Sequence, residues 1–176
     1  LALFNEPNAT DGQLIMAQAK MDQAYSAFEQ LTVQGAAVRV RYLRLLFNLA
    51  YALQDKGRAI EHAIDLALYS EQEGNQAFAY GALGRTYAVR SEHGLAISYF
   101  HKALAIYNKD LEVENALLNA ANCYMSIGAL QLEKADAENA RVNLVQAQKI
   151  YLEHGRPTDV KEVQALIDTI KKGVAP

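Results

Sequence analysis

The sequence predicts an all-α protein, organised as an α-α superhelix of about eight antiparallel helices. Between Asn8 and Arg156 lie 149 residues without a proline, which would interrupt a helix. The chain has 30 alanines, against 24 valines, isoleucines and threonines together. Alanine is the best helix former, whereas β-branched residues favour strands. Apolar residues also recur at steps of three and four, which is the spacing of one helix face.

Composition excludes several classes of protein. The 176 residues suffice for one domain with a buried core. The single cysteine, Cys123, excludes a small domain held by internal disulfides. Seventeen Lys and Arg against twenty Asp and Glu give a net charge of −3, which argues against nucleic acid as a partner. The most apolar stretch, 38–53, carries three arginines and is shorter than the ~20 residues that span a bilayer, so we expect no membrane insertion.

The amino end shows no basic and apolar leader, and the first residue is leucine, so we expect residues to be missing upstream. We expect residues 1–10 to form an extended or disordered segment. The lone cysteine and the missing leader favour the cytoplasm and leave the periplasm open.

Turn signals divide the rest of the chain into eight predicted helices. Asp11 is a good N-cap for the first helix, and Gly35 can end it in the left-handed conformation. The Asp55-Lys56-Gly57 turn ends the second helix, and Gly74-Asn75 ends the third. The first four predicted helices cover residues 11–35, 36–54, 58–73 and 76–91.

The later helices are delimited in the same way. Asp110 is the expected cap of the sixth helix and Gly128 its stop, whereas Thr158 or Asp159 caps the last helix. Two lysines near 172 face the negative end of that last helix dipole. These four predicted helices cover residues 93–108, 111–127, 130–153 and 158–172.

Two stretches of the chain repeat one pattern. The clearer stretch has Tyr80-x2-Leu83-Gly84-x2-Tyr87 and then Ala96-x3-Phe100-x2-Ala103. Its sister has Leu117-x2-Ala120-Ala121-x2-Tyr124 and then Ala140-x3-Leu144-x2-Ala147. Upstream, Ala24-x3-Phe28 precedes Ala96-x3-Phe100 by 72 residues, which is two steps of 36. Such a period indicates a repeat array.

These motifs resemble the tetratricopeptide repeat (TPR), a hairpin of two antiparallel helices whose copies stack into a solenoid. Small residues let the two helices approach closely, and we expect Gly84 and Ala121 to meet Ala96 and Ala140. Large residues then fill the gaps between hairpins, and these are Tyr87, Tyr124, Phe100 and Leu144.

The resemblance implies a half repeat at 11–35 and repeats at 36–75, 76–110 and 111–157. A capping helix and tail follow at 158–176. The junction of the third repeat is about seven residues longer, so we expect both of its helices to extend past the ordinary frame. For the second helix, one register places Tyr51 under Tyr87, and a preferred one matches Asn48 with Asn119.

Nothing in the sequence indicates an enzyme, a cofactor or a metal site. The four histidines are scattered, and we expect a turn near Gly94 to separate His93 from His101. Cys123 lies between small and aromatic neighbours on a helix, which favours packing over nucleophilic catalysis. The glycines around Gly84 lie inside a helix, so they form no phosphate-binding loop.

In arrays of this type the first helix of each pair lines a concave groove. The residues that we expect to bind a partner there are Arg44, Asn48, Tyr51, Phe78, Arg85, Asn115, Asn119 and Asn122. Asparagine amides suit a bound peptide backbone, or alternatively only contact water and cap turns. Arg44 and Arg85 could hold a carboxylate, with Phe47, Tyr51 and Phe78 in apolar contact. The Lys/Asn carboxylate clamp of chaperone-binding members is not matched, because Phe47 and Tyr51 occupy its positions.

The arginines at 39, 41 and 44 anchor an acidic partner or form an exposed stripe whose stems cover apolar surface. The leading hypothesis is a protein-interaction module, the scaffold or sensory part of a larger bacterial protein, that binds a peptide or helix in the groove. One alternative is an input domain of a signalling enzyme or transcription regulator. Another is a homodimer completed through the half repeat.

Overall fold

The computed structural model describes residues 36–53, 55–69, 73–109 and 115–172, with single helical residues at 12, 16, 19, 20, 22, 23 and 26. The predicted extended segment 1–10 and most of the predicted first helix, 11–35, lie outside the described residues. So do the expected caps Asp11 and Asp110.

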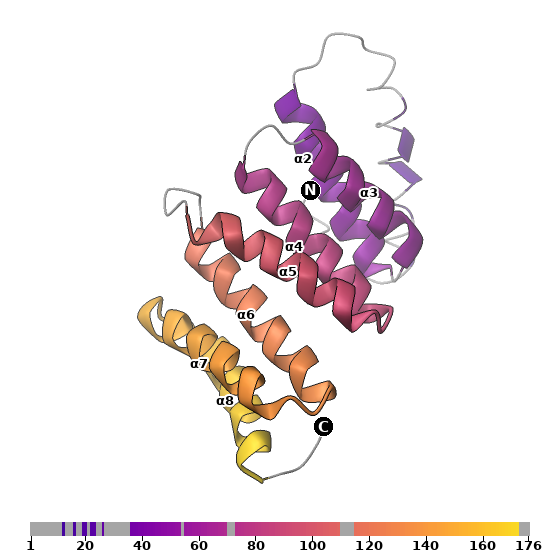
Figure 1. Ribbon diagram of the computed structural model, residues 1–176. Helices are drawn as coiled ribbons and strands as arrows, with labels where there is room; N and C mark the ends of the chain where they lie inside the picture. The colour runs from indigo at the N-terminus through magenta and orange to yellow at the C-terminus, as the bar shows by residue number, and fades with distance from the viewer. Residues whose placement is uncertain are drawn as a thin grey trace.

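The described ranges form seven helices: α2 (Ala36–Ala52), α3 (Lys56–Tyr69), α4 (Glu73–Val89), α5 (His93–Tyr107), α6 (Ala116–Glu133), α7 (Ala137–Glu153) and α8 (Pro157–Lys172). These residues include no strand. Each helix packs against the next, and α2, α4, α6 and α8 also contact one another in turn. Figure 1 shows the resulting elongated array, with α2 and α3 at one end and α7 and α8 at the other. The predicted all-α superhelix is confirmed, with seven helices rather than eight in the described part.

The turns after α4, α6 and α7 have one geometry. Ser91, Ala135 and Gly155 all have a positive φ, of 61°, 59° and 63°. In each turn the next residue donates its N–H to the carbonyl five residues back, as Glu92 does to Tyr87 at 2.9 Å and Asp136 to Gln131 at 2.9 Å. These are Schellman turns, which satisfy carbonyls at a helix end. The Asp55 N–H makes the same bond to the Ala50 carbonyl after α2.

The turns give the true register of the repeats. The turn between α6 and α7 follows the turn between α4 and α5 by 44 residues. The turn between α2 and α3 precedes the turn between α4 and α5 by 37 residues. Gly84 therefore corresponds to Gly128 in α6, not to Ala121 as the sequence pattern suggested. Neither predicted register of the second helix is correct, because Phe47 corresponds to Gly84.

Glycines lie where the two helices of a hairpin cross. A Cβ on Gly84 would lie 2.8 Å from Cδ1 and Cε1 of Phe100, and one on Gly128 would lie 2.7 Å from Cγ of Leu144. In the first hairpin the sizes are exchanged, because the corresponding residues are Phe47 on α2 and Ala63 on α3, both fully buried. Gly84 and Gly128 thus meet a large side chain on the partner helix, and a Cβ on Gly128 would also lie 3.1 Å from the carbonyl oxygen of Ala140.

Several predicted helix ends were wrong. Gly57, Gly74 and Gly128 lie inside α3, α4 and α6 instead of ending a helix. Asp55 caps α3 through its Oδ1, which accepts the Arg58 N–H at 3.1 Å, so α3 begins earlier than predicted. His93 and His101 lie on one helix, α5, with no turn between them.

The last helix also begins earlier than predicted, at Pro157, which suits the first helical position. Asp159 lies in its first turn and accepts a bond from Arg156 Nε at 2.7 Å, instead of capping the helix. Neither Thr158 nor Asp159 is therefore the N-cap.

The core is a series of overlapping clusters rather than one centre. Two clusters join α2, α3 and α4, one around Phe47, Ala63 and Leu83 and the other around Leu43 and Leu66. The next joins α4, α5 and α6 around Phe100, and the last joins α6, α7 and α8 around Leu144 and Val163. Each cluster takes residues from three consecutive helices, so burial is local along the array.

The predicted packing residues lie in these clusters. Ala96, Phe100, Ala103, Ala121, Ala140, Leu144 and Ala147 are buried, as is Gly84. Tyr87 and Tyr124 are partly buried, and the Tyr124 hydroxyl accepts a bond from Asn108 Nδ2 at 3.1 Å.

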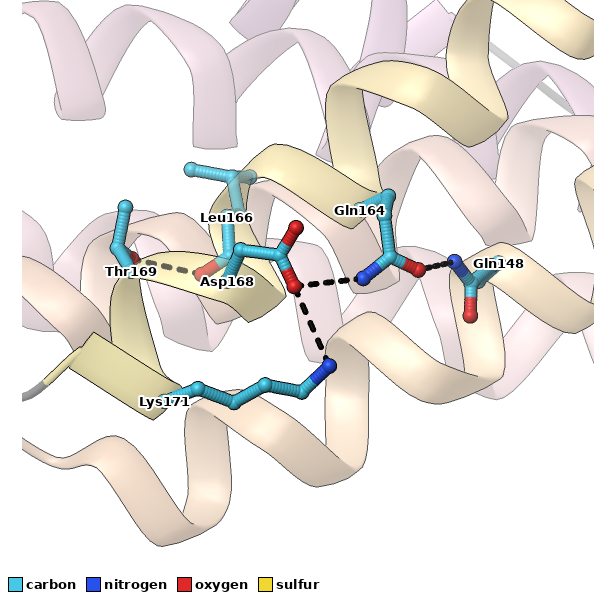
Figure 2. Close-up of polar contacts among 6 residues, drawn as sticks. All are labelled: Gln148, Gln164, Leu166, Asp168, Thr169 and Lys171. Carbon is cyan, nitrogen blue, oxygen red and sulfur yellow. Dashed lines mark hydrogen bonds and ion pairs between the residues drawn. The ribbon is translucent and has the colours of Figure 1, made fainter.

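Polar side chains also join α7 to α8 (Figure 2). Gln148 Nε2 donates to Gln164 Oε1 at 2.7 Å, and Gln164 Nε2 donates to Asp168 Oδ1 at 2.9 Å. The same Asp168 oxygen accepts from Lys171 Nζ at 3.2 Å. These bonds, that of Gln164 first, hold the pKa of Asp168 below its usual value. No helix of the described part is both long and apolar enough to cross a membrane.

Candidate functional site

Aromatic rings from two first helices meet at α2 and α4. Phe47 and Tyr51, one turn apart on α2, stack with centroids 5.8 Å apart. Phe78 on α4 meets Phe47 edge-on, with centroids 6.1 Å apart and an interplanar angle of 89°. Phe47 is fully buried, whereas Tyr51 and Phe78 are partly exposed. The rings thus form a short apolar surface across the two helices.

Two arginines lie on these rings. The Arg85 Cζ atom is 5.3 Å from the ring centre of Phe47, 5.7 Å from that of Tyr51 and 5.8 Å from that of Phe78. The Arg44 Cζ atom is 4.3 Å from the ring centre of Phe78. A guanidinium at such distances is attracted by the negative face of the ring. We call these five residues, Arg44, Phe47, Tyr51, Phe78 and Arg85, the arginine–aromatic cluster.

Arg85 is desolvated, and no described carboxylate is among the groups that shift its pKa. Burial lowers its pKa from the usual value, yet a guanidinium stays charged at neutral pH. Its nearest ionisable neighbours include Tyr107 on α5 and Cys123 on α6. Burial raises the pKa of Tyr107 and raises that of Cys123 to about 12, so both are neutral at pH 7.

The surrounding helices supply no carboxylate to the arginines. α2 has no acidic residue, α4 has only Glu73 at its start, and α6 has only Glu133 at its end. Among the described residues, no salt bridge joins Arg44 or Arg85 to an acid. The cluster is therefore a partly exposed cationic site with aromatic walls.

Asn115 lies just before α6, Asn119 and Asn122 lie on it, and their hydrogen bonds join residues outside this cluster. Asn115 precedes α6 with a φ of 59°, and its carbonyl accepts the Asn119 N–H at 2.9 Å. Asn122 Oδ1 accepts the Tyr151 hydroxyl at 2.5 Å, which ties α6 to α7. Within the described ranges, no hydrogen bond or ring contact links these asparagines to the arginine–aromatic cluster.

The corrected register changes which residues share a position on α2, α4 and α6. Asn48 is exposed on α2 and corresponds to Arg85, not to Asn119. Phe78 corresponds to Arg41 on α2 and to Asn122 on α6. At this one position α2 therefore carries a cation, α4 an aromatic ring and α6 an amide.

Sequence reasoning missed Tyr107 and Cys123 as neighbours of Arg85. They lie on α5 and α6, and no local pattern marks a residue on one helix as close to a given side chain on another. Gly128 was missed as a crossing residue, although it follows Gly84 by the same 44 residues that separate Ala96 from Ala140.

The described residues hold no group of three or more His, Cys, Asp and Glu that could bind a metal ion. His93 Nε2 lies 3.2 Å from Glu133 Oε2, in a contact between α5 and α6. Cys123 is buried with a raised pKa, so its reactive thiolate is scarce at neutral pH.

Comparison of the chain with protein-family models, with curated proteins and with solved structures gives no match. The described helices pack in consecutive pairs, an arrangement compatible with a helical repeat solenoid.

Proposed function

We propose that this chain is a protein-interaction module of the tetratricopeptide type, which binds a peptide or helical segment of another protein. The proposed binding surface is the face made by the first helices of the hairpins, α2, α4 and α6. In this proposal the chain is the scaffold or sensory part of a larger cytoplasmic protein and has no catalytic role.

The observation that carries the proposal is the meeting of side chains from successive first helices. Arg85 on α4 contacts two rings of α2 and one of its own helix. It also lies close enough to Cys123 of α6 to lower the pKa of that thiol against the effect of burial. Partly exposed aromatic rings and arginine are the residue types that contribute most to binding at protein interfaces.

The repeat geometry supports the tetratricopeptide type. Hairpins with one turn geometry recur at 37 and 44 residues, and a small residue faces a large one at each helix crossing. Stacked hairpins of this kind leave one face of the first helices free for a ligand.

The test is selection of ligands from a displayed library of random 12-residue peptides. A selected peptide, added to the isotopically labelled chain, should shift the amide resonances of α2, α4 and α6. Shifts confined to α3, α5 or α7 would contradict the proposal, and so would a library that yields no peptide.

Matched variants locate the surface. Tyr51→Ala and Asn119→Ala should weaken binding of the selected peptide, since both residues lie on the first helices. Tyr69→Ala changes a 44% exposed ring on α3 and should leave the affinity unchanged. Circular dichroism of each variant checks that the fold is intact. Equal loss in all three variants would count against a site on the first helices.

A further inference from the structure

We propose that the arginine–aromatic cluster recognises an acidic peptide segment, in which Asp or Glu side chains bind Arg44 and Arg85 and an apolar neighbour packs on Phe78 and Tyr51. This inference rests on the proposed function, because it names the chemistry of the segment bound at the same face.

Charge is the first reason. A guanidinium taken out of water without a carboxylate loses solvation that ring contacts only partly replace. Arg85 is in this state, with three rings around it and no acidic partner among the described residues. An incoming carboxylate can form two parallel hydrogen bonds with each guanidinium, which is the geometry that arginine offers and lysine does not.

The arrangement of the two arginines is the second reason. Both Cζ atoms lie within 6 Å of the centre of one ring, that of Phe78, although they come from different helices. Stacking on a ring restricts a guanidinium, so less side-chain entropy is lost when a ligand binds. Arg44 is exposed and can meet a ligand without rearrangement of the core.

The extent of the positive charge favours a run of acidic side chains over a single terminal carboxylate. Arg41 is exposed one turn before Arg44, and α2 contains no acidic residue. Positive charge therefore continues along α2 beyond the ring contacts. A segment with two or more Asp or Glu residues matches this surface better than one anionic group does.

The experiment compares two variants of one helix that lose the same charge. Arg44→Gln removes the guanidinium on Phe78, whereas Arg39→Gln removes one that lies 4.6 Å from the ring centre of Tyr69. Peptides selected from the random library should be enriched in Asp and Glu next to an apolar residue. Arg44→Gln should weaken their binding about ten-fold, and Arg39→Gln should change it less than about two-fold. Fluorescence anisotropy of a labelled peptide measures both.

Changes in the peptide complete the test. Replacing its Glu or Asp by Gln or Asn should weaken binding to the wild-type chain and have a smaller effect on the Arg44→Gln variant. Amidation of the peptide carboxyl end should leave binding unchanged. If amidation abolishes binding, the recognised group is a terminal carboxylate and the inference is overturned.

The failures of the two proposals are distinguishable. Peptides that bind α2, α4 and α6 but show no acidic enrichment would overturn the acidic-segment inference and leave the proposed function standing. Equal weakening by Arg39→Gln and Arg44→Gln would also overturn the inference, because it would indicate general attraction. A library that yields no peptide would overturn both proposals.

Discussion

At the scale of single residues, the hairpin turns carry a conformational cost. Ser91 and Ala135 adopt the left-handed conformation that their side chains disfavour, whereas Gly155 adopts it freely. The three turns bond alike, with backbone distances of 2.9 Å in the longer-range bond of each. The same bonding pattern thus occurs with serine, alanine or glycine at the left-handed position.

Ala135→Gly should raise the free energy of unfolding by about 0.5–1 kcal/mol, because glycine removes the strain of a positive φ at an exposed position. Urea unfolding followed by circular dichroism measures the change. Ala105→Gly, at an exposed position within α5, is the control and should lower stability by about 1 kcal/mol. If Ala135→Gly lowers the free energy of unfolding, the positive φ of this residue does not strain the backbone.

Two buried tyrosines make the fold sensitive to alkali. Burial raises the pKa of Tyr107 and Tyr151 above the usual 10.0 of a tyrosine. The folded chain therefore keeps both protons at a pH where the unfolded chain releases them, so stability present below pH 10 is lost as the pH rises above it.

The free energy of unfolding should fall with pH above about 10, and the double variant Tyr107→Phe/Tyr151→Phe should show a shallower fall. Urea titrations between pH 8 and pH 11 supply the slopes. Identical slopes in the wild type and the double variant would rule out a contribution from these tyrosines. Below pH 10, loss of the Tyr151 bond to Asn122 should lower stability by about 1 kcal/mol.

At the scale of helices, a small residue is paired with a large one where the two helices of each hairpin cross. Gly84 faces Phe100 and Gly128 faces Leu144, whereas Phe47 of the first hairpin corresponds in register to the glycines and shares its cluster with Ala63. Each crossing thus pairs a large side chain with a small residue, although the large side chain lies on a different helix in the first hairpin. Close-packed interiors require this balance, because an added methylene has no free space to enter.

Gly84→Ala should lower the free energy of unfolding by about 1–3 kcal/mol, since its Cβ would lie 2.8 Å from the Phe100 ring. The same change should cost much less in a Phe100→Ala background, where the ring is absent. Gly81→Ala is the matched control on α4, with no atom within 4 Å of the new Cβ, and should stabilise the chain by about 0.5–1 kcal/mol. A double-mutant cycle that shows no coupling between positions 84 and 100 would contradict a close contact between these residues at the helix crossing.

At the scale of the whole molecule, the overlapping clusters make stability local. The cluster of α6, α7 and α8 shares no buried residue with the two clusters of α2, α3 and α4. α8 covers the end of the array through Val163 and Ile167, helped by the Gln148 and Gln164 link of Figure 2. A change at one end should therefore be felt little at the other.

Val163→Ala should speed hydrogen exchange in α7 and α8 by an amount on the order of 2 kcal/mol of opening free energy, and leave α2 and α3 unchanged. Native-state hydrogen exchange resolved by residue is the measurement. Val142→Ala, at a 58% exposed position of α7, is the control and should have little effect. Faster exchange throughout the array would show one cooperative unit instead.

Much of this array followed from local patterns. Alanine content and the spacing of apolar residues predicted the helices, and the Ala-x3-Phe-x2-Ala pattern predicted which faces of α5 and α7 are buried. The register failed at glycine, because a glycine that allows two helices to cross resembles in sequence a glycine that ends one. The motifs on the second helices of the last two hairpins are 44 residues apart in the sequence. The same step leads from Gly84 to Gly128, and applying it would have corrected the register of the first helices.

The sequence by itself determined the fold class, the order of the helices and the residue types available on the first helices. These properties depend on backbone propensity and on the 3.6-residue period, which act over a few residues. Only the tertiary structure decided that Arg44 and Arg85 share the ring of Phe78, that Asn122 bonds Tyr151, and that Gly128 lies under Leu144. Those contacts join different helices, and their geometry depends on how side chains of particular volume fit across a crossing.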